Sequence, residues 1–102
     1  MSEDPKVTVV LPHQLRERAG GSRTLSVTAT TVREAIRALD HAYPGMTFSI
    51  CEETGDLRPF VNVFVGDESV RFLQGMDTPI TSGDVVHIIH SVAGGSGTSD
   101  AT

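Results

Sequence analysis

The sequence predicts one α+β domain in which a mixed sheet of four to five strands wraps around one main helix. Three observations lead to this fold class: segments of alternating hydrophobicity near both ends, one amphipathic segment between them, and glycine-containing turns that separate the segments. The chain has 102 residues, 38% of them hydrophobic, which is enough for a single core. We expect a flexible N-terminus over 1–5, the domain over 6–92 and a flexible tail over 93–102.

Two segments near the N-terminus alternate between inward-facing and outward-facing residues with a period of two. The inward positions are Val7, Val9 and Leu11 in the first segment and Leu25 and Val27 in the second. This period is typical of half-buried strands. The polar stretch 13–23 between them contains Gly20-Gly21, a turn signal, so we expect the two strands to pair as a hairpin.

A helix is expected to begin at Thr31, because Thr31 and Glu34 have the spacing of a capping box. In this motif the Thr31 hydroxyl accepts a hydrogen bond from the Glu34 amide, and the Glu34 side chain reaches back to the cap. Hydrophobic residues then recur at helical spacing, at Val32, Ala35, Ile36, Leu39, Ala42 and Tyr43. Pro44-Gly45 ends the run, which predicts one amphipathic helix of about three turns packed on the sheet.

The second half of the chain begins with a stretch, 46–59, whose pattern favours no element. The next segment, 60–65, is the strongest strand of the chain, and Gly66-Asp67 predicts a tight turn into a short strand within 68–72. A further turn at 82–84 leads into the final strand.

The final strand, 85–91, determines the arrangement of the sheet. If one helix is to cover both the first and the last strand, these two strands must lie at the centre as parallel neighbours, which is the β-grasp arrangement. The residues that follow then project from a rigid body. They are Val92, Ala93, Gly94 and Gly95.

Gly94-Gly95 is the most informative feature of this tail. Two residues without Cβ tolerate almost any backbone conformation, which suits a chain that threads a narrow active site and reacts at its own carbonyl. We therefore expect function at Gly95, within a threading segment that starts at Val92. The alternative is a solvated glycine/serine linker without a chemical role.

The composition excludes several classes of protein. A formal net charge of −5, without a cluster of lysine and arginine, argues against a nucleic-acid-binding surface. No apolar run approaches the roughly 20 residues that span a bilayer, and the acidic start lacks the features of a signal peptide, so we expect a cytoplasmic protein without membrane contact. No serine, cysteine or aspartate has a base at useful spacing, so we expect no catalysis by this chain.

Side chains that could bind a metal are scattered. His13 and His41 lie on separate elements, and His87 and His90 are three apart on one strand, where they point to opposite faces. We therefore expect no metal site. Cys51 is the only cysteine, which excludes an internal disulfide, and the two glutamates that follow it disfavour the thiolate. A structural thiol is expected rather than an acceptor of persulfide.

The period of the last two strong strands also predicts a docking patch. If Val61, Val63, Val65, Val86 and Ile88 face the helix, then Phe60, Asn62, Phe64 and Ile89 face outward. Phe64 and Ile89 then form an apolar patch near the tail, of the kind that a transient partner buries. The alternative is that segment 46–59 covers these side chains.

Three segments resemble the ubiquitin-like sulfur carriers of the MoaD and ThiS type, and most closely their cysteine-biosynthesis branch. They are RPFVNVFVGDESVRF from Arg58 to Phe72, PITSGDVVHI from Pro79 to Ile88, and VAGG from Val92 to Gly95. The resemblance implies a β-grasp fold and a carrier with no permanently bound cofactor. An E1-like enzyme would use ATP to adenylate the Gly95 carboxylate, and a sulfurtransferase or another sulfur source would convert it into a thiocarboxylate. In such families the outer sheet face docks the activating enzyme.

The same resemblance implies the later steps. In the cysteine branch the acceptor is a pyridoxal-phosphate (PLP) enzyme, and molybdopterin, thiamin and thio-metabolite pathways are the next candidates. Such carriers end at the second glycine, whereas residues 96–102 follow here, so the resemblance requires a JAMM-type zinc peptidase to remove this extension. Two alternatives stay open: a protein modifier conjugated through Gly95, and a small subunit of a molybdopterin-synthase-like complex.

Overall fold

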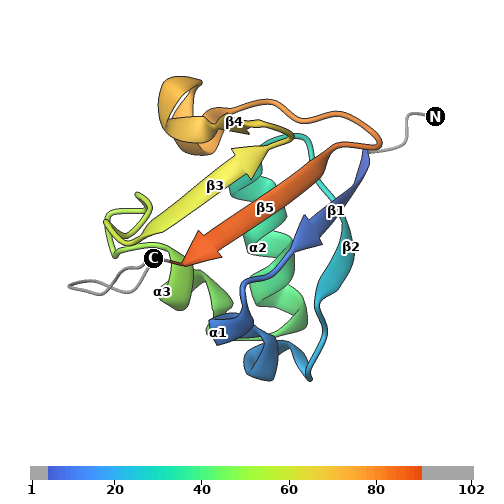
Figure 1. Cartoon of the computed structure of the whole chain (residues 1–102), viewed down its shortest axis with the longest axis vertical. Helices are drawn as coiled ribbons and strands as arrows, with labels where there is room; N and C mark the ends of the chain where they lie inside the picture. Colours follow the sequence, from blue (N-terminus) through green and yellow to red (C-terminus); the bar gives the residue numbers. More distant parts are fainter. Residues whose placement is uncertain (1–4, 91–102) are drawn as a thin grey trace.

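The structure is a computed structural model that describes residues 5–90 of the chain. It contains one sheet with helices on one side (Figure 1). The strands are β1 (Lys6–Val10), β2 (Thr24–Thr28), β3 (Val61–Val65), β4 (Glu68–Ser69) and β5 (Val85–His90). The α-helices are α1 (His13–Arg16), α2 (Val32–Ala42) and α3 (Met46–Ile50), and the 3-10 helices are η1 (Glu17–Ala19), η2 (Val70–Phe72) and η3 (Gly75–Asp77).

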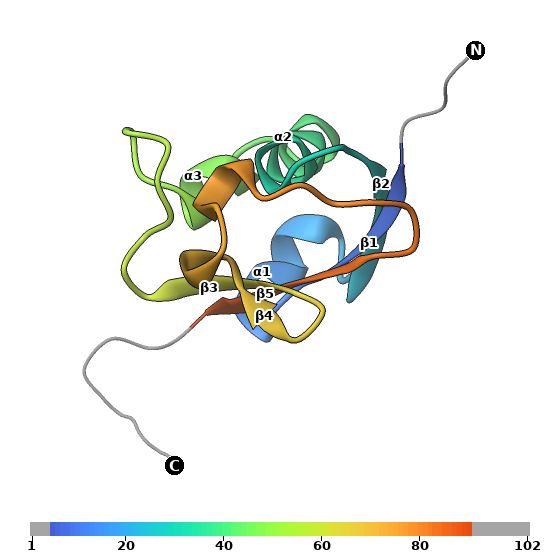
Figure 2. The ribbon, with the colours of Figure 1, turned by 90° about the horizontal axis from the view of Figure 1, so that it is seen from above.

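The sheet has the strand order β2-β1-β5-β3-β4. β1 and β5 are parallel neighbours, while β1–β2, β3–β5 and β3–β4 are antiparallel. The predicted β-grasp arrangement is therefore confirmed, with the last strand at the centre of the sheet. Figure 2 shows α2 and α3 on one face of β3 and β5, so the opposite face of these strands is an outer face.

The core lies between the sheet and α2, and its residues follow the predicted periods. Inward positions of the strands are buried: Val7 and Val9 in β1, Val61 and Val63 in β3, and Val86 and Ile88 in β5. The apolar stripe of α2 covers them with Val32, Ala35, Ile36 and Leu39, each of which is at most 1% exposed. Burial of this stripe, rather than intrinsic helix propensity, is what stabilises α2 in the domain.

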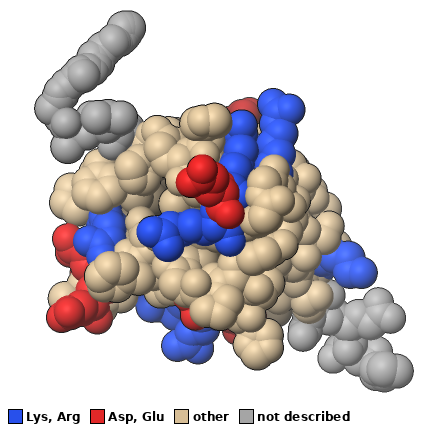
Figure 3. Space-filling view, turned by 90° about the horizontal axis from the view of Figure 1, so that it is seen from below, with Lys and Arg blue, Asp and Glu red and all other residues tan. Residues whose placement is uncertain are grey.

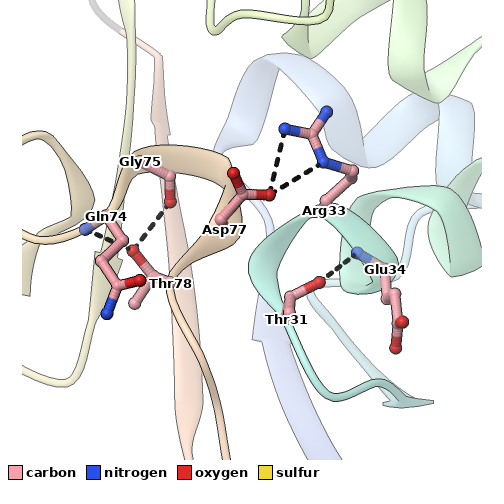
Figure 4. Close-up of polar contacts among 7 residues, drawn as sticks. All are labelled: Thr31, Arg33, Glu34, Gln74, Gly75, Asp77 and Thr78. Carbon is pink, nitrogen blue, oxygen red and sulfur yellow. Dashed lines mark hydrogen bonds and ion pairs between the residues drawn. The ribbon is translucent and has the colours of Figure 1, made fainter.

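The N-terminus of α2 is capped as predicted, with one difference. The Thr31 hydroxyl accepts a hydrogen bond from the Glu34 amide at 3.2 Å (Figure 4). The Glu34 carboxylate, however, accepts from the Thr30 amide at 2.9 Å and from the Thr30 hydroxyl at 2.7 Å, rather than from Thr31. Thr30 offers two donors at once. Hydrogen bonds from its backbone and then its side chain hold the pKa of Glu34 below the ordinary value.

An ion pair and a hydroxyl link η3 to its surroundings (Figure 4). The Arg33 guanidinium of α2 lies 3.3 Å from the Asp77 carboxylate of η3. The Thr78 hydroxyl donates to the Gly75 carbonyl at 2.8 Å and accepts from the Gln74 amide at 3.1 Å. These contacts fasten the long connection between β4 and β5 over the start of α2.

The unassigned stretch 46–59 contains a helix. Met46 and Ile50 of α3 are fully buried, and Cys51 pairs with Leu57 in an isolated bridge. The Asp40 carboxylate accepts hydrogen bonds from the amides of Thr47 and Gly45, each at 3.0 Å, and so satisfies the start of α3. A helix of five residues is shorter than the window over which a helical period can be recognised.

Two other expectations need correction. The short strand expected within 68–72 is only two residues long, because the chain turns into η2 at Val70. The polar stretch 13–23 is not a simple turn, since it forms α1 and η1, whose Leu15 and Ala19 are buried. Within residues 5–90, no helix is long and apolar enough to cross a membrane.

Candidate docking surface and the root of the C-terminal tail

The central strand β5 holds the point from which the tail leaves the domain. β5 pairs with β3 along most of its length and with β1 over its first half. Hydrogen bonds on both sides therefore fix its direction in the sheet. The predicted site residues Val92, Ala93, Gly94 and Gly95 lie outside the described residues, so their roles stay predictions.

The two residues of the predicted docking patch lie on the outer face of the sheet. Ile89 is 43% exposed and Phe64 is half-buried. Phe64 pairs with His87, and Ile89 lies two residues further along β5, so the two are diagonal neighbours with Cα atoms about 7–8 Å apart. Segment 46–59 is not a cover for them, because α3 packs against α2 on the opposite face.

A third hydrophobic side chain extends this surface. Phe72, at the end of η2, is 87% exposed, the largest value among the exposed large hydrophobic residues of the described chain. With Phe64 it lines a hollow of about 430 Å³ whose rim carries Asp67 and Glu68. We call Phe64, Phe72 and Ile89 the outer patch. Its acidic rim fits a partner whose complementary surface is basic.

Local hydrogen bonds set the position of Phe72. The Ser69 hydroxyl donates to Asn62 Oδ1 at 2.8 Å and accepts from the Arg71 amide at 3.2 Å, which ends β4 and starts η2. The Arg71 guanidinium donates to the Val61 carbonyl at 2.7 Å. Sequence reasoning missed Phe72 because it was assigned to a strand. The available signal was Ser69, a residue type that favours the start of a helical turn.

Phe60 does not face outward as expected. It precedes β3, packs partly against the core and contacts the His90 ring edge-on, with the ring centroids 4.9 Å apart. His90 shares the parity of Val86 and Ile88, so both rings lie on the helix side of the sheet. The period of β3 fails at Phe60 because this residue lies before the strand begins at Val61.

The other side chains considered for chemistry are the possible metal ligands and Cys51. Within residues 5–90, no three histidine, cysteine, aspartate or glutamate side chains gather in a way that could hold a metal. Cys51 is buried, and burial is the main cause that raises the pKa of its thiol, against the opposing effect of Arg33 and Arg58. The expected direction is right, but its cause is burial rather than the adjacent glutamates.

Comparisons with known proteins agree with this geometry. A model of the ThiS family matches residues 9–95. The sulfur carrier protein CysO of Mycobacterium tuberculosis is 40% identical over 91 residues, covering 87% of this chain and 98% of that protein. The match to the family model therefore spans nearly the whole described domain and stops at the second glycine of the tail.

Two solved structures show the same fold. The crystal structure of the BexX/CysO complex of Amycolatopsis orientalis contains a chain that matches with a TM-score of 0.82 and 36% identity, over 87% of this chain and 99% of that one. The solution structure of small archaeal modifier protein 1 from Methanosarcina acetivorans matches with a TM-score of 0.79 and 26% identity, over 92% of this chain and 100% of that one.

Proposed function

Because this chain belongs to the ThiS family of ubiquitin-like sulfur carriers, we propose that it carries sulfur as a thiocarboxylate on Gly95. Like its relatives, the protein is a carrier and not itself a catalyst. The observation that supports this site is the position of the glycine pair. It follows the central strand β5 by a few residues, and the family match ends at its second member.

The chemistry at Gly95 needs an activating partner. A free carboxylate is a resonance-stabilised anion and a poor electrophile, so an E1-like enzyme would use ATP to form the acyl-adenylate and release pyrophosphate. A sulfurtransferase persulfide or another sulfur source then attacks the acyl carbon, and AMP leaves. Sulfide gives the thiocarboxylate directly, whereas a persulfide gives an acyl disulfide. A second thiol then attacks the donor sulfur of that S–S bond, which releases the thiocarboxylate and leaves the donor and the thiol joined as a disulfide. The product is a thiocarboxylate on a short arm, whose effective concentration at a docked acceptor is high.

The extension 96–102 must be removed before this chemistry. As encoded, the Gly95 carbonyl belongs to an amide, and an amide cannot be adenylated. The family match stops at this residue, which supports cleavage after Gly95. We propose that a JAMM-type zinc peptidase makes this cut.

The sulfur acceptor we propose is a PLP-dependent enzyme that forms cysteine. The identity with CysO over almost the whole of that protein supports this choice. The next candidates for the sulfur acceptor are enzymes of thio-metabolite, molybdopterin and thiamin pathways, because other members of the family supply sulfur to them.

The outer patch is the surface we propose for the activating enzyme. Phe64 and Phe72 offer apolar area on this face, and Ile89, one residue before the end of β5, continues it toward the root of the tail. A partner seated there has the tail within reach. The solved complex of a similar carrier with BexX supports docking by a domain of this kind.

A second candidate function is conjugation of Gly95 to lysines of other proteins. The similarity to a small archaeal modifier protein favours it. A modifier would appear as an isopeptide-linked ladder, whereas a carrier would appear as a free chain with a thiocarboxylate. A small subunit of a molybdopterin-synthase-like complex would instead copurify with its large subunit.

The test is reconstitution with the E1-like enzyme of the same cell, ATP and sulfide, followed by intact-mass measurement. We expect sulfur on Gly95 of the processed chain. Gly95→Val should abolish it, because a β-branched side chain crowds the acyl carbon, while the fold stays intact since Gly95 lies beyond every described element. Ala42→Val, which introduces the same β-branched side chain at an exposed position of α2, is the control and should leave sulfur incorporation unchanged. Equal sulfur incorporation in Gly95→Val would refute the site.

A further inference from the structure

A hollow lies beside the end of β5, on the face of the sheet opposite to the outer patch. It measures about 430 Å³, and its lining includes Leu15, Arg18, Phe48, Arg58, Phe60 and His90. We call it the tail-root hollow, because His90 is the last described residue before the tail. Its walls come from three parts of the chain that are far apart in sequence: α1 with the adjoining η1, α3, and the approach to β3.

The tail-root hollow combines apolar walls with two arginines. Leu15 is buried beneath it, Phe48 is 68% exposed, and the Arg58 guanidinium lies over the Phe48 ring, 4.9 Å from its centroid. The Arg58 Nε also donates to the Phe48 carbonyl at 2.8 Å, so this cation is held in place. Arg18 is exposed.

Both arginines are free to take an anion. Within residues 5–90 the only ion pair joins Arg33 to Asp77, so neither Arg18 nor Arg58 has a carboxylate partner there. Arg58 and Phe48 also line an adjoining hollow together with Glu52 and Glu53, but neither glutamate forms an ion pair with Arg58. Figure 3, which views the side where α1 lies, shows basic side chains on a largely uncharged surface, with acidic side chains beside some of them.

His90 adds an unsatisfied polar atom to the hollow. Its Nδ1 is buried and has no hydrogen-bond partner among the described residues. A buried polar atom without a partner costs free energy, so a turn of the ring that lets an occupant of the hollow hydrogen-bond to this atom is favoured. The hollow therefore suits a short segment with a backbone, an apolar side chain and a terminal anion.

We propose that the tail-root hollow is the resting site of the chain's own segment 91–95 once Gly95 is its free terminus. Arg18 and Arg58 bind the Gly95 carboxylate or thiocarboxylate, and Val92 packs on the aromatic wall. This inference rests on the proposed function, which supplies the free terminus.

Chain geometry and charge support this occupant. Val86, Ile88 and His90 face the helix side, so a tail that continued the same period would present Val92 to the side of the hollow. The five residues after His90 span at most about 17 Å when extended. Arg18 and Arg58 line the same hollow as His90, so a bend at the glycine pair, which turns the chain back toward His90, brings Gly95 to these arginines. Arginine pairs with carboxylate-like anions through charge-assisted hydrogen bonds.

The consequence is a carrier that shields its sulfur between enzymes. A docked thiocarboxylate is less accessible to alkylating and oxidising molecules than one on an extended arm. Exposed ion pairs are weak, so an enzyme that binds the outer patch and the extended tail can withdraw the segment readily.

The test compares the reactivity of the sulfur in matched variants. The chain through Gly95 contains every described element, and its thiocarboxylate is installed chemically by cleaving a fusion with sulfide. Iodoacetamide then alkylates the sulfur with loss of iodide, and intact mass gives the rate. The variants are Arg18→Gln, Arg58→Gln and the double variant. Arg23→Gln is the control, because Arg23 is an exposed arginine of the same segment that does not line the hollow.

We expect the double variant to react about threefold to tenfold faster than the parent, the range for two exposed arginine–anion pairs. The alkylation rate of each single variant should lie between those of the parent and the double variant, and the rate of Arg23→Gln should equal that of the parent. High salt should raise the rate of the parent but not that of the double variant. The Arg58 guanidinium donates to α3, whereas no hydrogen bond from the Arg18 guanidinium is found among the described residues, so Arg18→Gln tests the idea even if Arg58→Gln disturbs α3. Equal rates in all variants, or equal acceleration by Arg23→Gln, would overturn the proposal. Because the sulfur is installed chemically, neither outcome depends on whether cells load Gly95.

Discussion

Truncation of Phe72 separates the docking role of the outer patch from the stability of the domain. Phe72 is 87% exposed, so Phe72→Ala removes almost no contact within the free domain. We expect its free energy of unfolding to change by no more than about 0.5 kcal/mol, the usual range for surface substitutions. Affinity for the activating enzyme, in contrast, should fall.

The size of that loss follows from the exposed area. Burying a phenylalanine side chain fully contributes about 1.5–3 kcal/mol. A partner that covers the 87% of Phe72 now exposed would gain about 1.3–2.6 kcal/mol, so Kd should rise roughly tenfold to seventyfold in Phe72→Ala. Isothermal titration calorimetry with the E1-like enzyme measures this directly.

The matched control is Phe48→Ala, which removes the same side chain from an exposed position, 68% accessible, on the opposite face. It should not weaken binding. If it frees the tail from the tail-root hollow, it can only raise affinity. Unchanged affinity in Phe72→Ala, or an equal loss in Phe48→Ala, would refute the assignment of the outer patch as the docking surface.

Three further predictions concern the domain itself. Thr31→Ala should lower the free energy of unfolding by about 1 kcal/mol in urea titrations, because the cap to Glu34 is lost. Leu39→Ala, at a fully buried position, should cost about 2–5 kcal/mol in the same assay. Hydrogen bonds from the amides of Thr47 and then Gly45 lower the pKa of Asp40. Its carboxylate therefore stabilises the fold at any pH above the ordinary pKa of about 4, and this stabilisation is lost as the pH falls through the lowered pKa. The melting temperature of Asp40→Asn should therefore lie below that of the parent at neutral pH, and the two should converge in acid.

The sequence predicts the parts of the fold that are long and periodic. A pattern can be recognised where a feature extends over several residues. This holds for the buried positions of β1, β3 and β5, for the cap at Thr31 and for the apolar stripe of α2. The central position of β5 followed from a packing requirement rather than from any residue of that strand. These features position the root of the tail.

Short elements are the parts that could not be predicted. α1, with four residues, and α3, with five, end before one helical period repeats convincingly. The consequence for the site is direct, because both helices line the tail-root hollow and η2 presents Phe72. Phe64 and Ile89 were found because they lie on regular strands, whereas Phe72 and the arginines of the hollow depend on tertiary structure.

The most direct test of the central claim is the intact mass of this protein isolated from its own cells, with tandem sequencing of its C-terminal peptide. The proposed function predicts a chain that ends at Gly95 and in which sulfur replaces one oxygen of the terminal carboxylate. A chain that continues through Ser96 in all of the protein, with no sulfur on Gly95, would contradict it.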